Sequence, residues 1–409
     1  MSRVILHCDC NSFFASVETV LNPQYKNVPM AVCGSQEERR GIVLAKNELA
    51  KKYNVQTAET VYSAKKKCPS LVIAPPHHDE YVKFSKRVNE IYARYTDLIE
   101  PFGIDESWLD VTASGKLFGS GEEIAERIRK EVKEEIGITV SIGVSFNKVF
   151  AKLGSDYKKP DAVTVIDEAN FKDIVFPLPA SDLLFVGKKT AEQLRSMGIR
   201  TIGELAQTGR EILVLRFGKM GEVLHKYSNG LDDSPVCAER DDAKSISNGF
   251  TFKHDLIGYE QSRIGIHYLS EEIGRKLRNN SQLCATVAIT IKDEYLRSIQ
   301  RQKTQNPPTD ISKEIAKTAF ELLREAWSED KPIRMLTVCA TNLLKKEMSK
   351  TQLSFFEDNS EEQREKDKNI ENAVDKIRQT FGEEAILNGA VLETDIGIYE
   401  SRHNKNQRS

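Results

Sequence analysis

Two short acidic segments carry the clearest potential for chemistry in this sequence. Asp9 follows a short apolar run over residues 4–6, and Asp105 and Glu106 are neighbours between two apolar stretches. Each segment alone has an ordinary explanation, because Asp9 could cap a helix and adjacent acids are typical of a surface turn. Together they fit phosphoryl transfer, in which carboxylates from separate strands converge on two divalent cations about 3.5–4 Å apart.

The chemistry of the acids also indicates which cation they would bind. Mg²⁺ is a hard cation that prefers oxygen ligands, so acids and backbone carbonyls suit it. Adjacent strand residues face opposite sides of a sheet, so Asp105 and Glu106 can share one edge only if a turn or bulge lies there. We therefore expect a turn next to this pair.

The elements that must position these acids alternate between strand and helix up to about residue 166, as in an α+β or α/β domain. We expect strands at 4–6, 28–33, 41–45, 98–103, 107–111 and 139–145. We expect helices at 12–21, 47–53, 61–67, 79–95, 121–136 and 148–156.

The rest of the chain divides into three parts by pattern. Residues 171–230 are almost wholly helical in pattern, and 232–235 are typical of a linker. Residues 244–345 predict a second small α+β domain, with helices at 262–277 and 311–327 and strands at 284–291 and 333–340. A polar, acidic stretch follows, with a helix-like segment at 370–381.

The two acidic segments also carry a family resemblance. Asp-Cys-Asn-Ser-Phe-Phe-Ala-Ser-Val-Glu at 9–18 and Ile-Asp-Glu-Ser-Trp-Leu-Asp at 104–110 closely resemble the Y-family translesion DNA polymerases, which include bacterial DNA polymerase IV and UmuC-type subunits. The resemblance spans nearly the whole chain. It implies a low-fidelity, DNA-directed DNA polymerase that adds deoxynucleotides to a primer 3′ end and acts in DNA repair and damage tolerance.

The resemblance also implies the architecture. It predicts an α+β right-hand polymerase with a ferredoxin-like palm, small fingers, a helical thumb and a separate α+β little finger. The expected ranges are palm 1–20 and 77–167, fingers 21–76, thumb 168–234 with a helix-hairpin-helix, little finger 242–345, and a clamp-binding motif with an acidic tail at 346–409.

In the family the acids hold two metal ions in each active site. By this resemblance Asp9 and Asp105 match the acids that bridge the metals, and Glu106 matches the third acid, near the primer end. The backbone carbonyl of Cys10 would bind the metal on the nucleotide. We expect Mg²⁺, and Mn²⁺ could replace it.

Four residues are predicted to contact the nucleotide. Phe13 and Phe14 face directions about 100° apart on a helix, and Phe14 matches the family's steric gate against a ribose 2′-OH; two ordinary core aromatics are the alternative. Lys159, before Pro160, matches a triphosphate contact. The fingers segment departs from the family's Tyr-Glu-Ala-Arg run, nearer the UmuC-like form, and leaves Lys51 as the best triphosphate candidate there.

DNA contacts are expected in two regions. Residues 186–199 resemble a helix-hairpin-helix, in which backbone N–H groups bind phosphate without reading sequence. Residues 275–303 hold seven Lys or Arg against two acids, a net of +5, although a solvated face explains such a run equally well. The predicted contacts are Gly187, Lys188, Lys189, Arg275, Arg278, Arg297 and Arg301.

A short apolar motif follows the predicted little finger. Gln352, Leu353, Phe355 and Phe356 resemble the peptide that binds the bacterial sliding clamp. Apolar residues in a polar stretch often mark a docking site. The acidic run over 357–375, with a net of −5, follows it.

Composition sets the remaining expectations. The 409 residues have a net charge of −2 and contain no run of eighteen apolar residues, so we expect no membrane span. Seven scattered cysteines without a C-x-x-C pair predict reduced thiols rather than a zinc site. We expect a cytoplasmic monomer that uses primer–template DNA, dNTPs and the sliding clamp. A non-catalytic clamp-bound scaffold and a two-metal nuclease are the alternatives.

Overall fold

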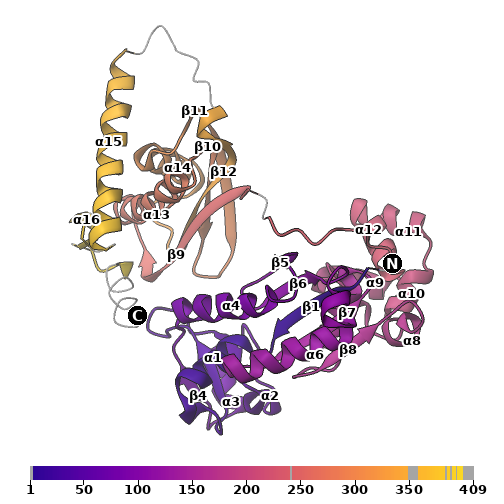
Figure 1. Cartoon of the computed structure of the whole chain (residues 1–409). Helices are drawn as coiled ribbons and strands as arrows, with labels where there is room; N and C mark the ends of the chain where they lie inside the picture. The colour runs from indigo at the N-terminus through magenta and orange to yellow at the C-terminus, as the bar shows by residue number, and fades with distance from the viewer. Residues whose placement is uncertain are drawn as a thin grey trace. The chain divides into compact units, whose positions relative to one another are not determined.

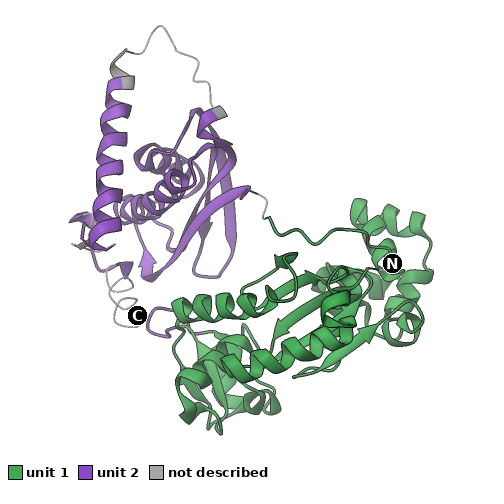
Figure 2. Ribbon diagram, viewed as in Figure 1, with its two compact units in different colours: residues 1–34, 42–240 green, residues 35–41, 241–409 purple. Residues whose placement is uncertain are grey.

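The computed structural model describes residues 3–239, 242–348, 358–382, 385–386, 389–392 and 394–398. The chain forms two compact units (Figure 2): unit 1 comprises residues 1–34 and 42–240, and unit 2 comprises 35–41 and 241–409. Within the described ranges, no helix has the length and apolar character needed to cross a membrane.

Unit 1 is built on a five-stranded sheet with the order β5-β6-β1-β7-β8 (Figure 1). Strand β1 is central and antiparallel to both β6 and β7, and β8 is parallel to β7. The strands are β1 Ile5–Cys10, β5 Ile99–Pro101, β6 Glu106–Asp110, β7 Val140–Ser145 and β8 Val163–Ile166.

The two faces of β1 meet different helices, because successive strand residues point to opposite sides. Leu6, Cys8 and Cys10 belong to a core with helices α4 (His78–Tyr92) and α6 (Gly121–Glu131), and a short π-helical stretch, Val132–Ile136, continues α6. Ile5 packs instead with Ala151 of α7 (Lys148–Tyr157). Helix α7 comes very close to β7, because a methyl group at Gly143 would overlap the Ala151 carbonyl.

The remainder of unit 1 is a small sheet and a helical region. Helix α1 (Phe13–Leu21) follows β1 directly, and a three-stranded sheet has the order β3-β2-β4. Its elements are β2 Met30–Cys33, β3 Val43–Lys46, β4 Val72–Ala74, α2 Glu48–Lys52 and α3 Val61–Lys67. The other helices are α5 Gly115–Phe118, α8 Phe171–Val175, α9 Lys188–Ser196, α10 Ile202–Gln207, α11 Arg210–Phe217 and α12 Lys219–Ser228.

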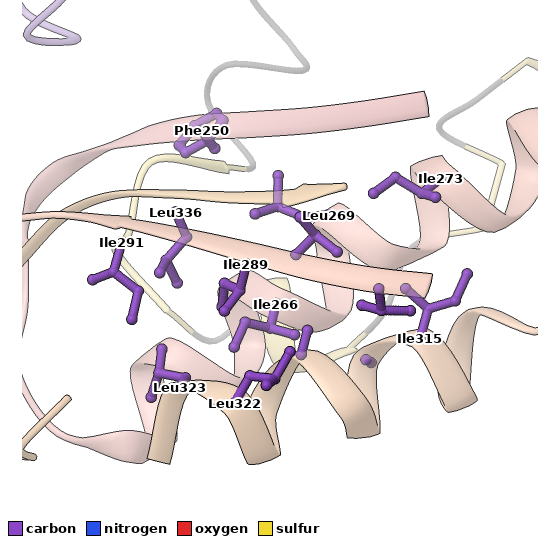
Figure 3. Packing of buried hydrophobic residues seen from close by; sticks show 14 of the residues in the cluster. Phe250, Ile266, Leu269, Ile273, Ile289, Ile291, Ile315, Leu322, Leu323 and Leu336 are labelled. Atoms are coloured by element: carbon purple, nitrogen blue, oxygen red, sulfur yellow. The ribbon is translucent and has the colours of Figure 1, made fainter. Parts of the chain in front are cut away.

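Unit 2 has a four-stranded antiparallel sheet with the order β11-β10-β12-β9. Two helices pack on it through a core of buried aliphatic residues, as Figure 3 shows for Leu269, Ile289 and Leu322. The elements are β9 Ser245–Leu256, α13 Tyr259–Asn279, β10 Gln282–Lys292, β11 Ser298–Thr309, α14 Ser312–Ala326, β12 Ile333–Lys345, α15 Asp358–Phe381 and α16 Gly389–Leu392.

The sequence prediction missed four strands: β4 and β8 in unit 1, and β9 and β11 in unit 2. Strand β11 has the sequence Ser-Ile-Gln-Arg-Gln-Lys-Thr-Gln-Asn-Pro-Pro-Thr, which lacks the apolar alternation of a half-buried strand. It lies at an edge of the sheet, where polar residues and proline are tolerated. Helix α15 begins at Asp358, twelve residues before the predicted start at 370. The prediction missed its first turns because they are wholly polar and carry no apolar periodicity.

Candidate active site

The three predicted acids come together at one end of β1 and β6. Asp9 stands opposite Glu106 in the antiparallel register. Asp105 lies in the bend just before β6, and its carbonyl accepts a hydrogen bond from the Cys10 N–H at 3.0 Å. The expected turn is therefore present, and it brings both neighbouring acids to the same sheet edge.

Lys159 neutralises Asp9. Its Nζ lies 2.6 Å from Asp9 Oδ2 and 2.7 Å from Asp156 Oδ1. Burial raises the pKa of Asp9 to about 6, because the effect of Lys159 only partly offsets burial and the nearby charges of Glu106 and Asp156. Burial opposes the charge of Lys159 as well, but Asp9 and Asp156 raise its pKa overall.

Glu106 has a different pair of partners, His7 and Lys152. His7 Nε2 is 3.2 Å from Glu106 Oε2, and Lys152 forms an ion pair with the same oxygen. The contact with His7, followed by those of Lys152, holds the pKa of Glu106 at about 2 despite burial. His7 is fully buried, which lowers its own pKa to about 4, and its Nδ1 lies 2.8 Å from Ser155 Oγ.

The donor chemistry at this edge fits divalent cations. Three carboxylates and the Cys10 carbonyl are hard oxygen donors. Burial, followed by the charge of Glu106, raises the pKa of Asp105, and burial also raises the pKa of Asp9, so a bound cation would favour the ionised form of both carboxyls. With the lysines paired as they are, no three acid, His or Cys side chains of the described residues are arranged to hold a metal ion.

The two phenylalanines of α1 take different positions. Phe13 is buried in the core, whereas Phe14 is partly buried. The ring of Phe14 stacks on Tyr81, with centroids 4.1 Å apart and planes 13° apart. The Tyr81 hydroxyl donates to Glu18 Oε1 at 2.5 Å, and His77 Nδ1 lies 2.8 Å from the same oxygen. The stack therefore has a buried, hydrogen-bonded support.

Lys51 lies beside the start of α1 and is paired with Glu48. Lys51 Nζ is 2.5 Å from Glu48 Oε1, and the Ser12 hydroxyl donates to that oxygen at 3.2 Å. An open cavity of about 430 Å³ is lined by Ser12, Glu48, Pro160 and Asp161, among other residues. The fingers segment and the turn after Lys159 therefore face one cavity.

Two groups of predicted DNA contacts are exposed. Gly187 is the N-cap of α9, and Lys188 and Lys189 form its first turn, so free backbone N–H groups and two cations occupy one helix start. Arg297 pairs with Asp293 of its own hairpin, and Arg301 is exposed on β11.

The two predicted contacts on α13 are engaged with acids. Arg275 pairs with Glu272 at 2.7 Å. Arg278 is largely buried, with its Nε 2.6 Å from Asp375 and its Nη1 in contact with Glu371, both on α15. The structure thus gives Arg278 an internal partner, and we do not keep it among the proposed phosphate contacts. The predicted clamp-binding residues Gln352, Leu353, Phe355 and Phe356 lie outside the described residues.

Apart from Lys159, sequence reasoning missed the residues around the acids. His7 is two residues before Asp9 on β1, so strand alternation alone puts both on one face. Lys152 and Asp156 are four residues apart on α7 and therefore share a helix face. These spacings could have been read from the sequence. Neither of them indicates that these faces of β1 and α7 lie next to Glu106.

Comparisons with known proteins match successive parts of the chain to DNA polymerases. The impB/mucB/samB family model matches residues 8–156, its C-terminal domain matches 243–355, and the thumb domain of DNA polymerase iota matches 181–232. The chain is 48% identical to DNA polymerase IV of Acetivibrio thermocellus over 401 residues, which covers 97% of this chain and 99% of the relative. It is 35% identical to DNA polymerase IV 1 of Bacillus subtilis, covering 96% and 94%. A solved Y-family DNA polymerase chimera superposes with a TM-score of 0.74 at 26% identity, covering 83% of this chain and 99% of the chimera.

Proposed function

The chain belongs to the impB/mucB/samB family, the Y-family of translesion DNA polymerases, and from that premise we propose that Asp9, Asp105 and Glu106 are its catalytic acids. The protein is a DNA-directed DNA polymerase that extends a primer and acts in damage tolerance. The observation that carries the site assignment is the register of β1 and β6, which puts Asp9 opposite Glu106 beside the Asp105 turn.

Asp9, Asp105, Glu106 and the carbonyl of Cys10 would hold two Mg²⁺ ions. When bound, the ions would activate the primer 3′-hydroxyl and neutralise charge on the transferred phosphate. The acids would bind cations only when they are ionised. While no cation is bound, Lys159 forms an ion pair with Asp9 and Lys152 forms one with Glu106. Lys159 would be free to contact the triphosphate once a cation replaces it as the partner of Asp9.

Further residues would select and hold the nucleotide. Phe14 borders the sugar as the steric gate, and the stack on Tyr81 supports this role by fixing the ring. Lys51 would join Lys159 on the triphosphate after release from Glu48. Glu48, the partner of Lys51, and Pro160, which follows Lys159, line the same cavity.

Primer–template DNA would be held without reading its sequence. The start of α9, with Gly187, Lys188 and Lys189, offers backbone N–H groups and positive charge to phosphates. Arg297 and Arg301 would add phosphate contacts from unit 2. We also propose that the protein is a cytoplasmic monomer and that residues 352–356 bind the sliding clamp.

The domain ranges given from the sequence are likewise part of this proposal. The five-stranded sheet falls within 1–20 and 77–167, and the three-stranded sheet falls within 21–76. Helices α8 to α12 fall within 168–234, and the sheet of unit 2 falls within 242–345.

A labelled primer–template with Mg²⁺ and all four dNTPs tests the function. A polymerase lengthens the primer, a scaffold leaves it unchanged, and a two-metal nuclease shortens it. Extension that is lost when Asp9 is replaced by Asn supports the site assignment. Shortening, or extension that survives this replacement, would refute it.

A further inference from the structure

The side chain of Asn11 joins three segments around the turn that carries Lys159. Asn11 directly follows β1 and is 6% exposed. Its Oδ1 accepts hydrogen bonds from the backbone N–H of Asp161 at 2.9 Å and from the Thr139 hydroxyl at 3.0 Å. Its Nδ2 donates to Ser141 Oγ at 2.8 Å. A backbone N–H can only donate, so the contact with Asp161 identifies the amide oxygen.

Asp161 is also held from its other side. Its carboxylate pairs with Arg129 at 2.8 Å and with Lys133 at 2.7 Å. Its φ is +54°, a conformation that a residue other than glycine rarely adopts. Asp161 is therefore held from several sides. Asn11 binds its backbone N–H, Arg129 Nη1 lies 3.5 Å from its carbonyl oxygen, and the carbonyl of the next residue, Ala162, accepts a hydrogen bond from the Ile142 N–H at 2.9 Å.

These contacts fix the backbone on which Lys159 stands. Helix α7 ends at Tyr157, and the grip of Asn11 begins at Asp161, so only residues 158–160 lie between two anchors. A lysine side chain has four rotatable bonds, so where its Nζ can reach depends on where its backbone is held. Without Asn11, the second anchor would lose its backbone contact to the end of β1.

We propose that Asn11 is a positioning residue for the incoming nucleotide, acting through Lys159. It ties the turn at 158–161 to the strand that carries Asp9, so that the triphosphate contact and the catalytic acid keep a fixed spacing. The inference rests on the proposed role of Lys159. Asn11 itself is not a catalytic residue, because its amide atoms are all used within the protein.

The effect should fall on nucleotide binding rather than on folding alone. A displaced triphosphate contact weakens the hold on dNTP, and we expect the KM for dNTP to rise about tenfold. The affinity for primer–template should be unchanged, because the side chain of Asn11 contacts Thr139, Ser141 and Asp161, and none of these is among the proposed DNA contacts. A merely structural role would instead lower the melting temperature and reduce the amount of active enzyme.

The test is single-nucleotide insertion with five variants of the full chain, four single and one double. Asn11→Leu removes the hydrogen bonds at similar size, and Asn11→Asp can keep them, since an Asp oxygen accepts from Asp161 and Ser141 can turn its hydroxyl to donate. Asn170→Ala is the matched control, because Asn170 bonds Asp167 N–H at 2.9 Å in another loop of the same unit. Lys159→Ala, alone and with Asn11→Leu, completes a double-mutant cycle. Thermal melting checks each variant, and Asn11→Ala substitutes if the Leu variant does not fold.

The expected result is a raised KM for Asn11→Leu, near-parental values for Asn11→Asp and Asn170→Ala, and no further rise when Asn11→Leu is added to Lys159→Ala. An additive double variant, or a KM that stays within about twofold for Asn11→Leu, would overturn the inference. If Lys159→Ala itself leaves the KM unchanged, the proposed role of Lys159 has failed instead. The two failures are therefore distinguishable.

Discussion

Asp9 and Glu106 stand directly opposite each other on the antiparallel strands β1 and β6. Side chains in such a pair point to the same face with Cβ atoms about 4.5–5.5 Å apart, and like charges there repel. Each acid has its own lysine, Lys159 for Asp9 and Lys152 for Glu106. The fold therefore places two carboxylates on one face of the sheet, where we propose that they share cations, and pairs each of them with a lysine of its own.

Replacing Asp105 tests the metal assignment. Asp105→Asn removes a charged ligand at similar size, so nucleotide addition should fall about a thousandfold or more, since each tenfold is about 1.4 kcal/mol of barrier. DNA binding should stay nearly intact, because the phosphate contacts lie elsewhere. Single-turnover extension and DNA titration measure the two effects. Asp110→Asn, at the far end of β6 from the acids, is the control; equal rates for both variants would end the two-metal interpretation.

The dependence on Mg²⁺ should change with pH near the pKa of Asp9. Burial raises that pKa to about 6, so below pH 6 metal-free Asp9 binds a proton that Mg²⁺ must displace. The Mg²⁺ concentration for half-maximal activity should therefore rise as pH falls below 6, by at most about tenfold per pH unit for one proton, and should level off above it. Glu106, with a pKa of about 2, adds nothing in this range. Mg²⁺ titrations at several pH values provide the measurement.

The same raised pKa predicts an effect on the stability of the metal-free protein. A carboxyl that binds its proton more tightly when folded stabilises the fold at low pH, and that stability is lost as pH rises through about 6. Asp9→Asn cannot ionise, so this variant should lose less stability between about pH 4 and pH 7. A parent and variant with parallel stability curves would contradict the assignment of this pKa to Asp9.

The sequence predicted the strands beside the acids but not the residues that surround them. Asp9 and Asp105 follow or precede short apolar strands, and local patterns of this kind are visible in a sequence. The partners of Arg278 are not visible in this way, because Glu371 and Asp375 come more than ninety residues later, on a helix whose packed face depends on tertiary structure. Strand β11 is equally hidden, since its polar residues suit a sheet edge and carry no period-two signal.

Phe14→Ala should weaken discrimination against ribonucleotides. The gate role needs a ring fixed near the sugar, and the stack on Tyr81 fixes it. Incorporation of rNTP relative to dNTP should rise by at least about tenfold, because a steric clash costs more than the roughly 1.4 kcal/mol that a tenfold change requires. Phe13→Ala is the control: it should lower the melting temperature, as a core cavity costs about 3–5 kcal/mol, without changing discrimination. The reverse pattern would transfer the gate to Phe13.

The apolar residues at 353–356 should act as a tether. Leu353→Ala with Phe356→Ala should abolish clamp-stimulated synthesis of long products, because each buried anchor of an interface is worth about 2 kcal/mol or more. Addition of single nucleotides without the clamp should survive, since the acids are untouched. A large drop in melting temperature with clamp binding retained would instead mean that these residues pack within the protein.

Arg278 and Arg301 should separate folding from DNA binding. Arg278→Ala leaves the charges of Glu371 and Asp375 without their buried partner, and breaking such a pair costs about 3–5 kcal/mol. Arg301 is exposed and donates to the carbonyl of its neighbour Gln300 at 2.8 Å, so Arg301→Ala should leave the melting temperature unchanged.

DNA binding should change in Arg301→Ala but not in Arg278→Ala, which is the reverse of the expected effects on stability. A phosphate contact releases condensed counterions, so losing Arg301 should reduce the slope of log affinity against log salt by about one. The folded fraction of Arg278→Ala should keep the parental slope, because its guanidinium is occupied by α15 and never reaches a phosphate. Binding titrations at several salt concentrations, at a temperature where both variants are folded, measure the slopes. A reduced slope for Arg278→Ala alone would return that residue to the DNA surface and would make its pairing with Glu371 and Asp375 a resting state that DNA displaces.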